Sequence, residues 1–170
     1  MAKNSFYIRA SVNAGDSDTY GSTEVDLGSY TNLGSSKPEV LRLHNIQAAI
    51  TDSAGEMPNC GADTGGTIAW QLTTQEQTGL VLATDDSFVS GGRGAYRNPD
   101  SSVMPATQAQ ESQILAQDWT NGYVIAVPSL FLGGIGSDQF TEDVYVSLVM
   151  ECTTEPMSKA NAVSLAISQQ

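Results

Sequence analysis

The sequence has few basic side chains. Seven Lys and Arg residues stand against 19 Asp and Glu residues, which gives a formal net charge of −12. The seven are scattered along the chain as Lys3, Arg9, Lys37, Arg42, Arg93, Arg97 and Lys159. A protein that binds nucleic acid directly needs clustered Lys and Arg to neutralise phosphates. We therefore expect no direct nucleic-acid binding.

Long hydrophobic runs are also missing. No apolar run approaches the ~20 residues that span a bilayer. The longest apolar stretch, residues 123–132, is interrupted by Pro128 and Ser129. The first residues, MAKNSFYIRASV, alternate like a strand and contain no signal-peptide core. We expect no transmembrane segment.

Cysteine and histidine, which carry much of the chemistry of protein sites, are rare. Cys60 and Cys152 are too few for a disulfide scaffold and are expected to be separate reduced thiols, with a bond between them as the alternative. The single histidine, His44, lies beside Arg42 in a predicted strand, and no G-x-S-x-G motif accompanies it. One His with two distant Cys does not make a zinc site. The sequence therefore predicts no enzyme, and no catalytic, cofactor-binding or metal-binding residue.

Two kinds of loop motif could hold a ligand. Aspartates in turns could supply oxygen to calcium, but no Glu closes a twelve-residue loop after Asp16. These aspartates are Asp16, Asp18, Asp63, Asp85 and Asp86. The run Gly91-Gly92-Arg93-Gly94 looks like a phosphate cradle, yet no Lys–Ser/Thr pair follows it. We interpret these motifs as turn chemistry and a mobile loop.

The sequence does contain period-2 alternation of apolar residues, which is typical of half-buried strands. Strands are predicted over 5–12, 23–27, 40–51, 67–73, 79–83, 123–127, 130–132 and 144–152. Trp70 alternates with Ile68 and Leu72 and is expected in the core. Residues 53–66 and 85–102 are rich in turn residues and are predicted to be loops. For residues 103–117 helix and strand both stay open.

One predicted strand, residues 40–51, changes phase. Leu41 and Leu43 have one parity, whereas Ile46, Ala48 and Ile50 have the other. A β-bulge near His44–Asn45 would return both sets to the same face. We predict that bulge.

About eight strands with long, glycine-rich connections favour an all-β, single-domain β-sandwich over residues 1–170, with a jelly roll as the first choice. An immunoglobulin-like sandwich is the second choice, but its Cys–Trp–Cys order is missing. Residues 157–170 could form a short helix after Ser158 or a loose C-terminal arm.

Four segments carry a family resemblance: SFYIRASV, STEVDLGSY, VLRLHNIQAAITDS and DVYVSLVMECTTEPMSKANAVSLAISQQ. In their order the chain resembles single jelly-roll coat (capsid) proteins of tailless icosahedral viruses, as found in uncultured marine viruses. The resemblance implies a self-assembling, non-enzymatic virion protein. Its partners would be further copies of itself, with a second capsid protein as a further partner. Residues 157–170 would then lie across a neighbouring subunit or beneath the shell.

Two other functions remain open. The first is a carbohydrate-binding or adhesin-type module with a stacking platform drawn from Trp70, Trp119, Tyr96 and Tyr123. The second is a filament or pilus subunit, which would assemble helically.

Overall fold

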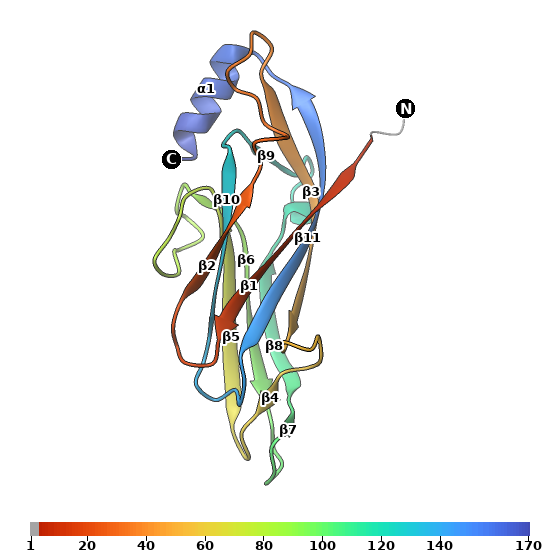
Figure 1. Ribbon diagram of the computed structural model, residues 1–170, viewed down its shortest axis with the longest axis vertical. Helices are drawn as coiled ribbons and strands as arrows, with labels where there is room; N and C mark the ends of the chain where they lie inside the picture. Colours follow the sequence, from red (N-terminus) through yellow and green to blue (C-terminus); the bar gives the residue numbers. More distant parts are fainter. Residues whose placement is uncertain (1–3) are drawn as a thin grey trace.

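The computed structural model describes residues 4–170, so Lys3 lies outside the described part. Two sheets pack face to face, and the strands run along the long axis of the molecule (Figure 1). The four-stranded sheet consists of β1 (Phe6–Gly15), β11 (Val144–Pro156), β3 (Glu39–Thr51) and β9 (Tyr123–Ile125), in that order. The five-stranded sheet consists of β2 (Gly21–Asp26), β10 (Ser129–Gly136), β5 (Gly65–Thr73), β6 (Phe88–Arg97) and β8 (Thr107–Ile114).

Short elements complete the molecule. β4 (Asn59–Cys60) and β7 (Met104–Pro105) form a two-stranded sheet, and η1 (Ala116–Asp118) is a 3-10 turn. The C-terminal helix is α1 (Lys159–Ser168). No helix of the described residues is both long and apolar enough to cross a membrane.

The strand order is that of a jelly roll, which confirms the predicted fold. β1, β2 and β3 alternate between the two sheets, and so do β8, β9, β10 and β11, so most neighbours within each sheet are distant in sequence. The exceptions are β5, β6 and β8, which lie side by side in the five-stranded sheet. The first and last strands pair directly, with Phe6 opposite Cys152 and Val12 opposite Val146. Such crossing connections distinguish a jelly roll from an up-and-down barrel.

The core lies between the sheets and is built by the alternation seen in the sequence. In β11, Val144, Val146, Leu148, Met150 and Cys152 all point inward and are buried. The other predicted inward residues, Trp70 among them, line the same core. The interior faces of the two sheets therefore form one continuous apolar cluster.

The predicted bulge in β3 is confirmed. Asn45 pairs with Glu151, but Leu43 pairs with Cys152, so His44 is the extra residue. The inserted residue lets Leu41, Leu43 and Ile46 all face the core, where each is at most 1% exposed. A regular strand would have placed one of these sets in water.

The prediction of a loop over 85–102 is wrong for most of that segment, because residues 88–97 form β6 in the five-stranded sheet. The glycines that suggest a loop instead leave room for aromatic side chains that pack against the strand. A Cβ on Gly92 would lie 2.5 Å from Trp70 Nε1 and 2.9 Å from Trp70 Cε2. The indole of Trp70 crosses its neighbouring strand at this glycine, which explains why a Gly-rich run occupies a strand.

The predicted short strand over 79–83 is also wrong. These residues belong to the connection between β5 and β6, with Leu82 76% exposed. Their apolar character did not reflect burial. The undecided segment 103–117 is mostly extended: β7, β8 and η1 follow one another, and β8 is an exposed edge strand.

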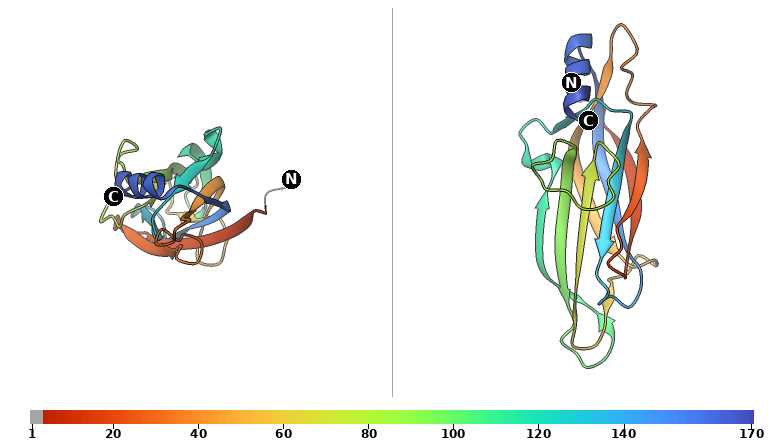
Figure 2. Two further views of the ribbon diagram at one scale, coloured as in Figure 1. Left: turned by 90° about the horizontal axis from the view of Figure 1, so that it is seen from above. Right: turned by 90° about the vertical axis from the view of Figure 1, so that its left-hand side faces the viewer.

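The C-terminal segment is a helix docked on its own sandwich, not a loose arm (Figure 2). Ser158 is the N-cap, and its hydroxyl accepts a hydrogen bond from Asn161 N at 3.3 Å. Ala162 is fully buried against Val40 and Ala126. Contact of this helix with a neighbouring copy stays a prediction. The extent of the single domain over residues 1–170 stays a prediction as well.

Candidate functional surfaces

The single histidine is the bulged residue of β3. His44 Nε2 lies 2.8 Å from Thr153 Oγ1 on the adjacent strand. No carboxylate is hydrogen-bonded to this imidazole within residues 4–170. Over the same residues, no three His, Cys, Asp or Glu side chains group so that they could hold a metal ion.

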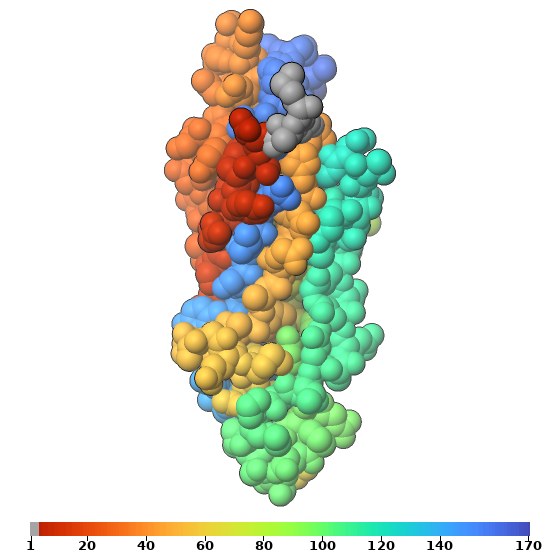
Figure 3. Space-filling view, turned by 90° about the vertical axis from the view of Figure 1, so that its right-hand side faces the viewer, coloured from red at the N-terminus to blue at the C-terminus, as the bar shows by residue number. Residues whose placement is uncertain are grey.

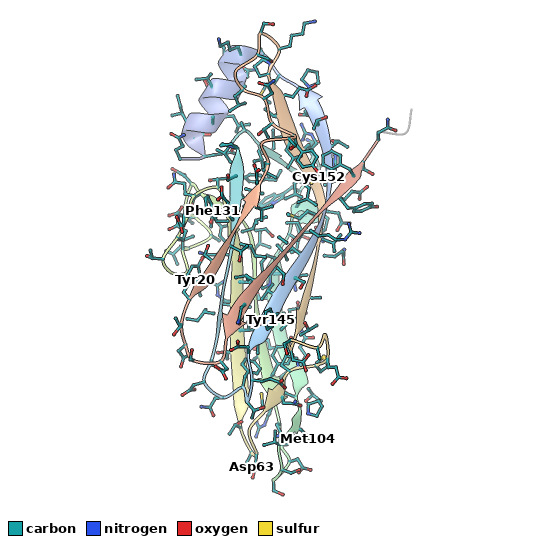
Figure 4. All side chains as sticks on the ribbon, viewed as in Figure 1. Tyr20, Asp63, Met104, Phe131, Tyr145 and Cys152 are labelled. Carbon is teal, nitrogen blue, oxygen red and sulfur yellow. The ribbon has the colours of Figure 1, made fainter. Side chains whose placement is uncertain are left out.

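Both cysteines are buried free thiols. Burial raises the pKa of Cys60, and the same cause raises the pKa of Cys152 to about 12. Because only a thiolate is a good nucleophile, neither thiol is activated at neutral pH. Figure 4 places Cys152 on β11. The expectation of two separate reduced thiols is confirmed.

The aspartates in the turns stabilise the conformation of the loops to which they belong. Asp18 and Asp63 have φ values of 54° and 52°, the left-handed conformation that Asp tolerates in tight turns. Asp85 accepts hydrogen bonds from the Ser87 amide and hydroxyl, and these bonds lower the pKa of Asp85. Asp63 lies at the opposite end of the molecule from α1 (Figure 4).

The four aromatic candidates for a stacking platform do not come together. Trp70 and Tyr96 are buried in the core, and Tyr123 is partly buried against it. Trp119 differs, since it is 53% exposed. Only this aromatic residue of the four offers an open ring face.

Trp119 lies on the rim of a polar hollow of about 660 Å³ beside the four-stranded sheet. The hollow is also lined by Arg42, His44, Gln117, Asn121 and Glu155. No sequence signal points to this hollow, because its residues come from β3, β11, η1 and the loop after η1.

Hydrogen bonds hold the walls of this hollow in place. Arg42 donates to both carboxylate oxygens of Glu155, at 2.8 and 2.6 Å, and to the Asn121 carbonyl at 2.5 Å. The Gln117 amide pairs with both backbone groups of Ile46, each at 2.9 Å. The polar groups around Trp119 are therefore preorganised, which lowers the entropic cost of binding a ligand.

A second hollow, of about 480 Å³, lies over the five-stranded sheet and is lined by Ala69, Arg93, Leu80 and Ile135 among others. The connection 74–87 reaches over this sheet and is fixed by Gln71. The Gln71 amide donates to Tyr20 Oη at 2.8 Å and to the Gly79 carbonyl at 2.9 Å, and its carbonyl accepts from Val81 N at 2.8 Å. Part of this sheet's outer surface is thus covered by the chain itself.

Comparison with known proteins finds no matching family model and no matching curated protein. Solved structures do match. The VP1 pentamer of human polyomavirus 7 superposes with a TM-score of 0.50 and 9% identity, covering 91% of this chain and 96% of that chain. VP1 of Trichodysplasia spinulosa-associated polyomavirus, solved with the GM1 oligosaccharide, gives a TM-score of 0.49 and 7% identity, covering 93% and 97%. At such identities the likeness concerns the fold alone, and this chain has the jelly-roll fold.

Proposed function

We propose that this protein is a self-assembling coat subunit of a virus particle, without enzymatic activity, of the kind found in tailless icosahedral viruses. The observation that carries the proposal is the jelly-roll topology, which matches the human polyomavirus 7 VP1 chain over nearly its whole length. The step from fold to function is an analogy, because one fold serves many functions. The family resemblance of the four sequence segments supports the same assignment.

The surface of the chain also fits an assembling subunit. Large apolar side chains are exposed on several sides of the sandwich, including Tyr7, Met57, Leu82, Trp119 and Ile167. A subunit in a permanent shell covers such residues against its neighbours. A second coat protein as a further partner remains part of the proposal.

The test is the assembly state of the purified chain. We expect closed particles by electron microscopy and a large mass by light scattering, with contacts that bury roughly 1,600 Å² or more per interface. Helical filaments would favour a pilus-type subunit instead. A monomer at high concentration and at every salt concentration would show that the coat function is wrong.

A carbohydrate-binding module is the second candidate, favoured by the Trp119 hollow. An exposed indole offers an apolar ring face to a sugar, and the fixed polar side chains around it can bond hydroxyl groups. On a glycan array we expect any strong hit to lose at least tenfold in affinity in Trp119→Ala.

Tyr7→Ala is the matched control, since Tyr7 is 56% exposed but does not line the hollow. A monomeric chain whose glycan binding depends on Trp119 and not on Tyr7 would establish the module. Binding that survives Trp119→Ala, or no binding at all, would remove this candidate.

A further inference from the structure

Nine of the 19 acidic residues of this chain lie in loops at one end of the sandwich. The loops 16–20, 52–64, 98–106 and 137–143 meet there, joined by bonds such as Asp63 N to the Asp100 carbonyl and Thr141 N to the Asn59 carbonyl (Figure 1). Their acids are Asp16, Asp18, Asp52, Glu56, Asp63, Asp100, Asp138, Glu142 and Asp143, and these loops contain no Lys or Arg. Like charges at this end oppose close approach of two copies.

The outer surface of the four-stranded sheet has the opposite character. The outward side chains of β1, β11 and β3 form four rows across the strands, which we call the flat face (Figure 3). The rows are Tyr7–Glu151–Asn45, Arg9–Val149–Gln47, Ser11–Ser147–Ala49 and Asn13–Tyr145–Thr51.

The flat face is electrically balanced. It carries one positive and one negative side chain, Arg9 and Glu151, and neither makes an ion pair within the described residues. The other positions are uncharged, and Tyr7 is 56% exposed. Interface cores in proteins are depleted of charge and enriched in tyrosine. On a chain with a net charge of −12, a face whose two charges cancel adds little repulsion between two copies.

The two sheets differ in how open their outer surfaces are. The connection 74–87 covers part of the five-stranded sheet and is pinned there by Gln71. On the flat face, the third row consists of Ser11, Ser147 and Ala49, which all have small side chains. The Ser11 hydroxyl bonds only within this row, to Ser147 Oγ at 3.2 Å. The flat face is therefore the more accessible of the two.

We infer that the flat face is the contact surface for a second copy of this chain. The inference rests on the proposed coat function and names one of its interfaces. Arg9 and Glu151 supply one charge of each sign to each partner, so two copies can pair these charges across the contact. The acidic end borders this contact at the row of Asn13, whose amide donates to Asp143 Oδ2 at 2.7 Å, but none of its nine acids belongs to the four rows.

A set of three Ser→Glu variants tests this interface, because the substitution is the same and only its place changes. Ser11→Glu puts a carboxylate in the middle of the flat face. Ser53→Glu adds the same charge in an exposed loop of the acidic end, and Ser112→Glu adds it on β8 of the five-stranded sheet. All three serines are exposed, and circular dichroism and thermal unfolding verify the fold of each variant.

Assembly is measured by light scattering and electron microscopy at equal concentration and salt. We expect Ser11→Glu to raise the concentration needed for assembly at least tenfold, while Ser53→Glu and Ser112→Glu stay within twofold of the wild type. Arg9→Glu should weaken assembly as Ser11→Glu does.

If the wild type assembles and Ser11→Glu assembles equally well, the flat face is not the interface, although the coat function stands. Loss of assembly in Ser112→Glu alone would assign the contact to the five-stranded sheet and overturn the inference. A wild type that never assembles would overturn the coat function and the interface together.

Discussion

Gly92→Ala is expected to lower the free energy of unfolding by about 3 kcal/mol, near the upper end of the range for overpacked cores. The new Cβ would lie 2.5 Å from Trp70 Nε1 and 3.1 Å from Gln113 Cγ. Trp70 is 1% exposed and cannot move without displacing its core neighbours. Denaturant unfolding followed by tryptophan fluorescence measures the change.

Gly79→Ala is the matched control. Nothing lies within 4 Å of a Cβ at Gly79, so this variant should be neutral or slightly more stable than the wild type. The double variant Trp70→Phe, Gly92→Ala should lose less stability than the sum of its single changes, because the smaller ring relieves the clash. Equal stabilities of Gly92→Ala and the wild type would contradict the packing described for β6.

Gln169→Ala is expected to cost about 2–3 kcal/mol, because it removes the side-chain partners of one buried and one partly buried backbone group. The Gln169 side chain accepts from Ala126 N at 2.9 Å and donates to the Val124 carbonyl at 2.7 Å. The residue is 2% exposed. These two bonds attach the end of α1 to the segment around β9.

Gln170→Ala serves as the control, since Gln170 is exposed and bonds only through its backbone amide. Hydrogen exchange should show that Gln169→Ala opens α1 first, with the sandwich strands less affected. If both variants unfold at the same denaturant concentration as the wild type, α1 does not contribute to the stability of its own domain. That result would support the expectation of a C-terminal arm.

Alternation was sufficient to predict most of the sandwich. In β1, β3, β5 and β11 the inward residues could be read from parity, and the phase change in β3 even located the bulge at His44. These strands have one buried and one open face, so burial imposes a period of two on their sequences. The jelly-roll order followed from strand number and long connections rather than from any pairing signal.

The failures have a common physical cause. In β6, Gly92 makes room for the ring of the distant Trp70, and a sequence cannot say which distant ring fills the space above a glycine. Gly91 and Gly94 make room for the rings of Phe88 and Tyr96, which belong to β6 itself. Residues 79–83 are apolar but lie in a connection, because Gln71, eight or more positions earlier, fixes that connection through its side chain. Both errors reflect tertiary contacts that override local composition.

The Trp119 hollow could not be predicted from the sequence for the same reason. Its lining residues are separated by more than a hundred positions, from Arg42 to Glu155, and only the pairing of β3 with β11 brings them together. The exposed ring of Trp119 was among the aromatic candidates. What the sequence could not supply was the set of fixed polar neighbours.

The pairing of β1 with β11 has a consequence for how the protein is made on the ribosome. Residues 6–13 acquire their hydrogen-bonded neighbour only when residues 145–152 have been synthesised and have left the exit tunnel. Until then the alternating apolar side chains of β1 are exposed in the nascent chain, in a topology dominated by slow, non-local contacts. We therefore expect the sandwich to complete its fold only after residues 145–152 have emerged, and to depend on chaperones that bind short extended apolar segments during that interval.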